Sequence, residues 1–319
     1  MKKIMIIISL LLVVSLLSSC DVNTDEESEE QFIFGGNSYA GGTNGIEFSF
    51  ERDSPPETIY NDDTFEIVLE VENLGEYDIS QDEMAFTVWN LPTNRFNLGS
   101  SEIGASLNSE LLGVLTDDGD KIPGDRDEII VESGVSSSLS EDDIPVGGMP
   151  FTIKAGACYR YKTESIANVC LVGDDRNPDQ VCDPNSNPEL INSGSPIQVK
   201  NFKQSLSGSR ININFIVSHE GDGEIFYNDD SLECSGREIN EKNLIDISIS
   251  SPRAEIDCNF DDGTSGDVQS GELKLYNNER FVTCEIRNID DSMNRMMPFE
   301  MELDFIYYQD IQKEIFLRR

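Results

Sequence analysis

Apolar and polar residues alternate with a period of two along much of the chain after residue 45. This alternation restricts the fold more than any other feature of the sequence. It runs through residues 46–50 and 65–71 in the first half, and through residues 211–217 and 245–249 in the second. Such alternation is typical of antiparallel strands with one face buried. No stretch after residue 20 carries apolar residues at helical spacing, so we expect an all-β chain.

The second half of the chain repeats a motif of the first half 146 positions later. Seven residues agree in type or role, running from Phe65 to Ile79 in the first copy and from Ile211 to Ile225 in the second. Solenoid repeats recur every 20–50 residues or so, and this much longer spacing indicates duplicated domains. We therefore expect two tandem antiparallel β-sandwiches.

The first copy contains the sequence Val71-Glu72-Asn73-Leu74-Gly75. This segment resembles the V-x-N-x-G strand of the adhesion-related CARDB-type domains found in prokaryotic surface proteins. Residues 46–80 also resemble the opening of uncharacterised secreted archaeal lipoproteins with such domains. The resemblance implies immunoglobulin-like sandwiches and carries no enzymatic activity with it. The second copy departs from the motif, because His219 stands where the asparagine would be.

Composition suggests where the two domains meet. Residues 183–196 are polar and rich in Pro, Gly and Ser, which is typical of a linker. This boundary predicts a first β-sandwich at 46–190 and a second at 195–319. Inside the first domain, we expect residues 97–143 to form a long acidic insertion, because twelve Asp or Glu and two basic residues lie between positions 100 and 145.

The N-terminus predicts export. A basic start, Met1-Lys2-Lys3, precedes an apolar run at residues 4–17, which is too short to span a bilayer and suits the core of a signal peptide. Leu17-Ser18-Ser19-Cys20 then resembles the lipobox of prokaryotic lipoprotein signal peptides. We expect residues 1–19 to be removed, Cys20 to carry the lipid, and residues 20–45 to form an acidic, glycine-rich tether. An ordinary signal peptide with a chance cysteine is the alternative.

Six cysteines remain after Cys20, and an even number in an exported chain indicates three disulfides. Cys258 shares the apolar parity of its strand with Ile256, and Cys284 shares that of Val282 and Ile286. Two cysteines that face the core from separate strands predict a Cys258–Cys284 bridge.

The other four cysteines allow three pairings. Cys158 and Cys170 flank a predicted hairpin centred on Glu164, which would place them opposite each other, although opposite positions lie slightly too far apart for a relaxed bridge. Cys182 and Cys234 are candidates for a bridge between the domains. A zinc site is disfavoured, because the chain has no C-x-x-C spacing.

The densest group of oxygen ligands lies within the acidic insertion. Asp118, Asp120 and Asp125 belong to a turn of the kind that can gather oxygen atoms around calcium. The loop lacks EF-hand spacing, because Ile122 stands where the third carboxylate belongs. A solvated acidic turn without metal is the alternative, and we predict no other cofactor.

Charge and composition limit the function. The formal net charge of −38 disfavours nucleic acid and anionic headgroups as partners, and a single histidine removes most histidine-based catalysis. We expect a non-catalytic lipoprotein on the outer face of the cell membrane, with a structural or adhesive role towards another surface protein or a polysaccharide. The alternatives are an exported hydrolase that acts on surface polymers through acidic residues of 97–143, and a solute-binding lipoprotein, which the strand-only pattern disfavours.

Overall fold

The computed structural model describes residues 39–117, 120–173, 179–229, 231–232, 234, 239–252, 254–260, 266, 268–289 and 292–319. These residues form β-strands and two single-turn 3-10 helices, so the expectation of an all-β, sandwich-like chain is confirmed. In chain order the elements are β1 Ile46–Phe50, β2 Thr58–Tyr60, β3 Thr64–Asn73, η1 Gln81–Glu83, β4 Met84–Trp89, β5 Glu102–Ser106, β6 Leu115–Asp117, β7 Asp120–Ile122, β8 Arg126–Ser136, η2 Glu141–Asp143, β9 Met149–Val172, β10 Leu190–Asn192, β11 Ile197–Ser207, β12 Arg210–His219, β13 Glu224–Phe226, β14 Leu244–Ser250, β15 Glu255–Cys258, β16 Val268–Lys274, β17 Glu279–Arg287 and β18 Asn294–Arg318.

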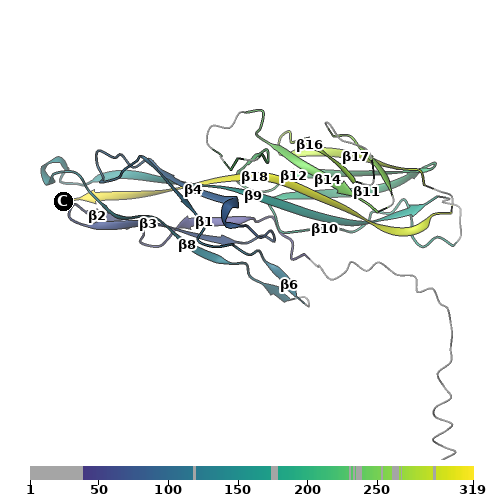
Figure 1. The fold of residues 1–319 in the computed structure, drawn as a ribbon, viewed down its shortest axis with the longest axis horizontal. Coiled ribbons are helices and arrows are strands. Elements are labelled where there is room, and N and C mark those ends of the chain that lie inside the picture. Colours follow the sequence, from purple (N-terminus) through teal and green to yellow (C-terminus); the bar gives the residue numbers. More distant parts are fainter. Residues whose placement is uncertain are drawn as a thin grey trace, which may run out of the picture. The chain divides into compact units, whose positions relative to one another are not determined.

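Two long strands form the centre of the molecule. β9 and β18 pair antiparallel from Asn294↔Val172 to Leu317↔Met149, which covers all 24 residues of β9 without a register shift. They lie side by side in Figure 1 as the long teal and yellow ribbons. Further strands extend the sheet on both sides in the order β16-β14-β18-β9-β4-β5.

A smaller sheet covers each half of this central sheet. The sheet β1-β3-β8 packs on one half, where the rings of Phe48 and Phe86 lie 6.2 Å apart. The sheet β11-β12-β17-β15 packs on the other half, where the rings of Phe202 and Phe299 lie 5.7 Å apart. We call the two resulting sandwiches the first lobe and the second lobe. Their buried residues belong to one hydrophobic core.

The motif repeated 146 positions later corresponds to a repeat in the structure. The shift places β3 on β12, the middle strands of the two covering sheets, and it places β9 on β18. In the central sheet, β14 and β16 follow one another beside β18 as β4 and β5 do beside β9, so these outer strands correspond by their position in the sheet. The lobes are therefore duplicated units that meet at the β9–β18 pair.

The structure corrects the predicted domain boundary. β9 comes from the predicted first domain and β18 from the second, yet each strand runs through both lobes. The polar stretch at 183–196 contributes β10, which pairs with β9, instead of forming a free linker. Because each lobe needs a strand from the other half of the chain, residues 46–190 and 195–319 are not separate folding units.

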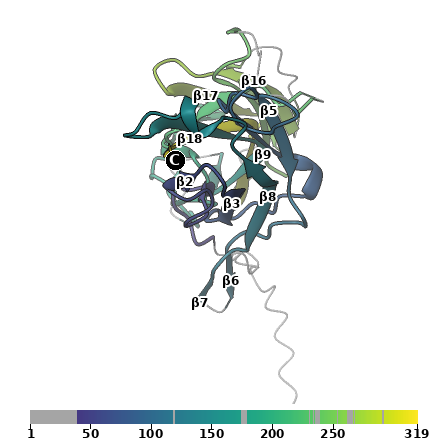
Figure 2. The same cartoon turned by 90° about the vertical axis from the view of Figure 1, so that its left-hand side faces the viewer.

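The predicted acidic insertion also has a different role. Within residues 97–143, β5 extends the central sheet and β8 completes the first covering sheet, burying Ile129, Val131 and Val135. The acidic residues of these strands, Glu102, Asp127, Glu128 and Glu132, lie at exposed or half-exposed positions, so a high count of charges conceals the strand pattern in the sequence. Only the hairpin of β6 and β7 projects from the body, as both views show (Figures 1 and 2).

Three disulfides link the described cysteines, which indicates an oxidising compartment. Cys258 pairs with Cys284, as the parity argument predicts, across the neighbouring strands β15 and β17. The hairpin centred on Glu164 is wrong, because β9 runs straight through that residue. Cys158 and Cys170 lie 12 residues apart along one extended strand and cannot bridge each other; Cys158 pairs with Cys234, and Cys170 pairs with Cys182.

The predicted signal peptide and Cys20 lie outside the described residues. Among the residues that the structure does describe, no helix has the length and apolar character needed to cross a bilayer.

Candidate functional site

The repeated motif positions one buried polar residue in each lobe. Asn73 ends β3, and its amide donates hydrogen bonds to the carbonyl oxygens of Tyr77 (2.7 Å) and Leu111 (3.1 Å). His219 occupies the equivalent end of β12, where its Nε2 lies 2.9 Å from the Tyr307 hydroxyl. The same shift of 146 positions relates Tyr307 on β18 to Tyr161 on β9, whose hydroxyl lies 3.4 Å from Asn73 Oδ1. His219 is buried at this strand end.

A glycine follows each of these strand ends because a tyrosine occupies the space of a side chain. A Cβ on Gly75 would lie 1.8 Å from the Tyr161 hydroxyl, and one on Gly221 would lie 2.2 Å from the Tyr307 hydroxyl. Burial raises the pKa of Tyr307 to about 12, so the phenol stays neutral. Burial also lowers the pKa of His219, which favours the uncharged ring.

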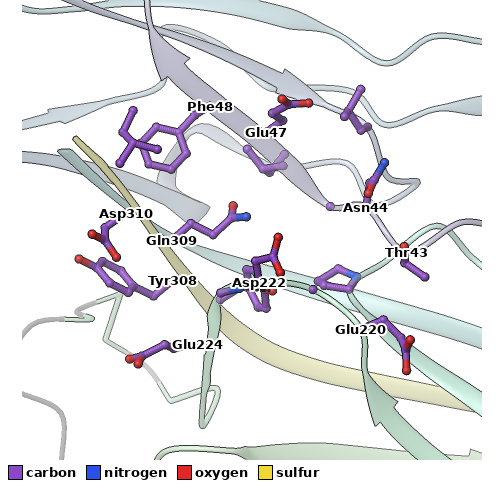
Figure 3. Close-up of a pocket in the computed structure, with 18 residues that line it drawn as sticks. Thr43, Asn44, Glu47, Phe48, Glu220, Asp222, Glu224, Tyr308, Gln309 and Asp310 are labelled. Carbon is purple, nitrogen blue, oxygen red and sulfur yellow. Dashed lines mark hydrogen bonds between the residues drawn. The ribbon is translucent and has the colours of Figure 1, made fainter. Parts of the chain in front are cut away.

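A cavity opens beside this second motif. It has a volume of about 740 Å³, and we call it the junction groove because strands of both lobes line it. One wall is formed by Thr43 to Phe48, which include most of β1, and the other by residues 220–224 and 307–311 (Figure 3). β18 is 25 residues long and runs through both lobes, so it passes along the groove where the lobes meet.

The junction groove is acidic at its rim and apolar between the sheets. Its lining contains five carboxylates and neither Lys nor Arg; the acids are Glu47, Glu220, Asp222, Glu224 and Asp310 (Figure 3). Two acids of this set form ion pairs: Glu224 pairs with Lys242, and Glu220 pairs with Lys200, which also donates a hydrogen bond to it. That hydrogen bond and another from Ser218 lower the pKa of Glu220. Ile46 and Phe48 supply buried apolar surface on the β1 side.

Two unpaired strand edges border the groove. Among the described strands, β1 is the outer strand of its sheet and pairs with β3 alone. β18 pairs with β9 along one side. On its other side, the pairing with β13 ends at Tyr308 of β18, and the pairing with β2 begins at Phe316 of β18. No described strand pairs with this side of β18 between these residues. Open strand edges offer unpaired backbone groups to an extended partner.

The predicted calcium residues lie away from this groove. Asp118 is outside the described residues, Asp120 is exposed at the start of β7, and Asp125 accepts a hydrogen bond from the Leu112 amide. No group of three metal-ligating side chains occurs in the part of the chain that the structure describes. Calcium at this turn stays a prediction.

The acids of 97–143 do not gather in the junction groove. Glu102 of this segment lines a second pocket of about 380 Å³, which also includes Trp89. Trp89 is half-buried beside Gly156, on the other face of the sheet.

Sequence reasoning missed the junction groove. The repeat comparison stopped at Ile79 and Ile225, and extending it to residues 149–172 would have matched them to β18. Tyr161 and Tyr307 would then have marked the two long strands. The groove acids had no signal of their own, because they come from three separate segments of a chain that is acidic throughout.

No protein-family model matches this chain, and no curated protein matches it. Solved structures give weak similarities. A secreted serine protease, VesC from Vibrio cholerae, shares 10% identity with a TM-score of 0.18 over 83% of this chain. The Escherichia coli alpha-2-macroglobulin activated by porcine elastase shares 8% identity with a TM-score of 0.18 over 86% of this chain. This chain spans about half (51%) of the first structure's length and about a third (32%) of the second's.

Proposed function

We propose that this chain is an exported, lipid-anchored surface protein that binds another macromolecule in an adhesive or structural role and performs no catalysis. The observation that carries the proposal is the junction groove, a 740 Å³ opening bordered by two free strand edges. One wall includes β1 of a covering sheet, the other includes β18 of the central sheet and the segment that leads into β13, and both sheets pack on one continuous core. Rigid walls of this kind favour binding, because little ordering entropy is lost when a partner enters.

Export and anchoring complete the proposal. The three disulfides support an extracellular location, where thiols oxidise. The lipobox that ends at Cys20 supports a lipid anchor, with the segment before β1 as its tether. Anchored in this way, the folded part would meet partners on the cell surface, for which we infer a surface protein or a polysaccharide.

Site-directed photo-crosslinking on intact cells tests the binding role. A photoreactive amino acid in place of Asp222 sits at an exposed position of the groove, and the same group in place of Val146, which is 92% exposed, serves as the matched control. We expect one recurring partner to be linked at Asp222 and not at Val146. Absence of an adduct at Asp222, and also at exposed Glu47 on the opposite wall, would refute the groove as a binding site.

A further inference from the structure

The second lobe shows what occupies a free edge of the central sheet. There β10 pairs antiparallel with β9, with Asn192 opposite Ser165 and Leu190 opposite Ala167. The repeat shift carries residues 165–167 of β9 to residues 311–313 of β18. No described strand lies at this equivalent position in the first lobe. One lobe therefore has a strand where the other has an open edge.

The open edge is seven residues long, from Gln309 to Ile315. The amide of Phe316 donates to the Glu57 carbonyl on this side of β18, at 2.8 Å. Backbone groups of alternate residues point to the same side of a strand. Asp310, Gln312 and Glu314 therefore direct their N–H and C=O groups towards the open side, where no described residue hydrogen-bonds to them.

The chain's own described segments do not reach this edge. Residues 40 and 41 are held elsewhere, since Glu76 accepts hydrogen bonds from the amides of Ala40 (2.7 Å) and Gly41 (2.9 Å). The Tyr39 hydroxyl donates to Glu164 in the second lobe. A second copy of the chain is disfavoured by charge, because two acidic edges of molecules with a net charge of −38 would repel each other.

The side chains around the edge indicate the sequence of an occupant. Side chains of a strand alternate between two faces. Ile311 and Phe48 lie on the side between the sheets, and Lys313 shares this side with its Nζ 6.0 Å from the centre of the Phe50 ring. Every second residue of an occupant therefore meets mainly apolar surface there. Asp310 and Glu314 are exposed on the other face, next to the remaining residues of the occupant. Opposite charges at neighbouring cross-strand positions attract.

We propose that the Gln309–Ile315 edge of β18 binds an extended, basic segment of a partner protein by strand addition. This proposal rests on the binding function proposed above. In this segment apolar residues alternate with Lys or Arg. The backbone groups of Asp310, Gln312 and Glu314 pair with the segment, the apolar residues enter the junction groove, and the basic residues face Asp310 and Glu314. Strand addition obtains affinity from backbone hydrogen bonds and specificity from alternate side chains.

Labelled heptapeptides titrated into the full chain and followed by fluorescence anisotropy test this proposal. The probe alternates four valines with three lysines, and a second peptide has glutamate in place of lysine. We expect the lysine peptide to bind at least tenfold more tightly. Two further peptides carry N-methyl groups on all valines or on all lysines, so that each blocks the backbone groups of one edge. Strand addition predicts that one of them loses binding at least tenfold and the other stays within twofold. Equal binding of both would overturn the proposal.

Two variants at one position localise the interaction. Gln312→Pro removes an outward N–H that has no described partner, and edge strands tolerate proline at such positions. We expect Gln312→Pro to lose peptide binding at least tenfold and Gln312→Ala to stay within twofold, with unchanged circular dichroism for both. Equal binding by both folded variants would overturn the assignment to this edge.

These outcomes separate the two proposals. If crosslinking at Asp222 captures a partner but no lysine peptide binds, the binding function stands and strand addition is wrong. If neither experiment gives binding, both proposals are wrong.

Discussion

Removal of the Cys258–Cys284 disulfide should destabilise both lobes together, although the bond lies in the second lobe. The bridge closes a loop of 26 residues between β15 and β17. The chain-entropy model of a disulfide gives about 3.5 kcal/mol for a loop of this length. This is a large part of the 5–15 kcal/mol that is typical of a folded domain. We therefore expect the double variant Cys258→Ala, Cys284→Ala to lose about 3.5 kcal/mol in its free energy of unfolding.

The shared strands predict that this loss is felt throughout the fold. β9 and β18 pair along 24 residues and belong to both lobes, so unfolding of the second lobe removes strands from the first. The single tryptophan, Trp89 on β4, provides a separate signal from the first lobe. In urea titrations, we expect its fluorescence and the far-ultraviolet circular dichroism to give one coincident transition for the wild type and for the variant.

An exposed substitution in the same lobe supplies the control. Val268 on β16 is 51% exposed, and Val268→Ala should change the free energy of unfolding by about 0.5 kcal/mol or less. Our reasoning would be refuted if the Trp89 transition kept its wild-type midpoint while the circular dichroism signal shifted. Such a result would show that the lobes unfold independently in spite of the shared strands.

Four further predictions follow from particular residues. Burial, followed by the nearby Glu272 and Asp304, raises the pKa of Asp246 to about 6, so its ionisation destabilises the fold as the pH rises from about 4 to 6. Asp246→Asn should therefore add about 1 kcal/mol at pH 7, after allowance for its partial exposure, and almost nothing at pH 4; equal gains in urea titrations at both pH values would contradict this. Gly75→Ala should cost about 1–3 kcal/mol because its Cβ would overlap the Tyr161 hydroxyl, whereas Gly99→Ala, with nothing within 4 Å, should be nearly neutral in the same assay. Metabolic labelling with a lipid precursor should tag the wild type and not Cys20→Ser, and equal tagging would disprove lipidation at this residue. Millimolar calcium should raise the melting temperature of the wild type and not that of a variant with Asn at Asp118, Asp120 and Asp125; no shift in the wild type would leave this turn as a solvated loop.

Much of the local structure could be predicted from residue order. The alternation at 46–50, 65–71, 211–217 and 245–249 corresponds to β1, β3, β12 and β14. Alternation is a local consequence of one buried face, and it needs no knowledge of the partner strands. The same parity argument identified the Cys258–Cys284 pair, because two core-facing cysteines on nearby strands can meet.

The local sequence pattern could not predict which distant strands pair with each other. β9 has polar residues at its centre, including Thr163, Glu164 and Ser165, which suggested a turn. In the structure this centre lies where one lobe passes into the other. Thr163 and Ser165 are buried, and their hydroxyls make hydrogen bonds to Ser195 and Asn192. In the sequence alone, polar residues at a junction between two cores have the same pattern as the turn of a hairpin.

The candidate site depends even more strongly on tertiary structure. Glu47, Asp222 and Asp310 are ordinary members of an acidic chain, and nothing in their neighbourhood along the sequence distinguishes them. They share a groove only because β18 runs past the end of β13 and on beside the first lobe. The edge from Gln309 to Ile315 is open because the pairing of β13 with β18 stops before Gln309 and the pairing of β2 with β18 starts after Ile315.

The sequence by itself therefore determined the strand pattern, the duplication, the oxidising compartment and one disulfide, since each depends on residue type, parity or spacing along the chain. The tertiary structure alone decided that the two sandwiches share β9 and β18, and which strand edges remain open. Those features depend on pairings between residues more than 100 positions apart, such as Tyr161 with Phe305. Backbone hydrogen bonds make these pairings, and they are nearly the same for every residue type, so the amino-acid sequence carries little direct record of which strands are neighbours.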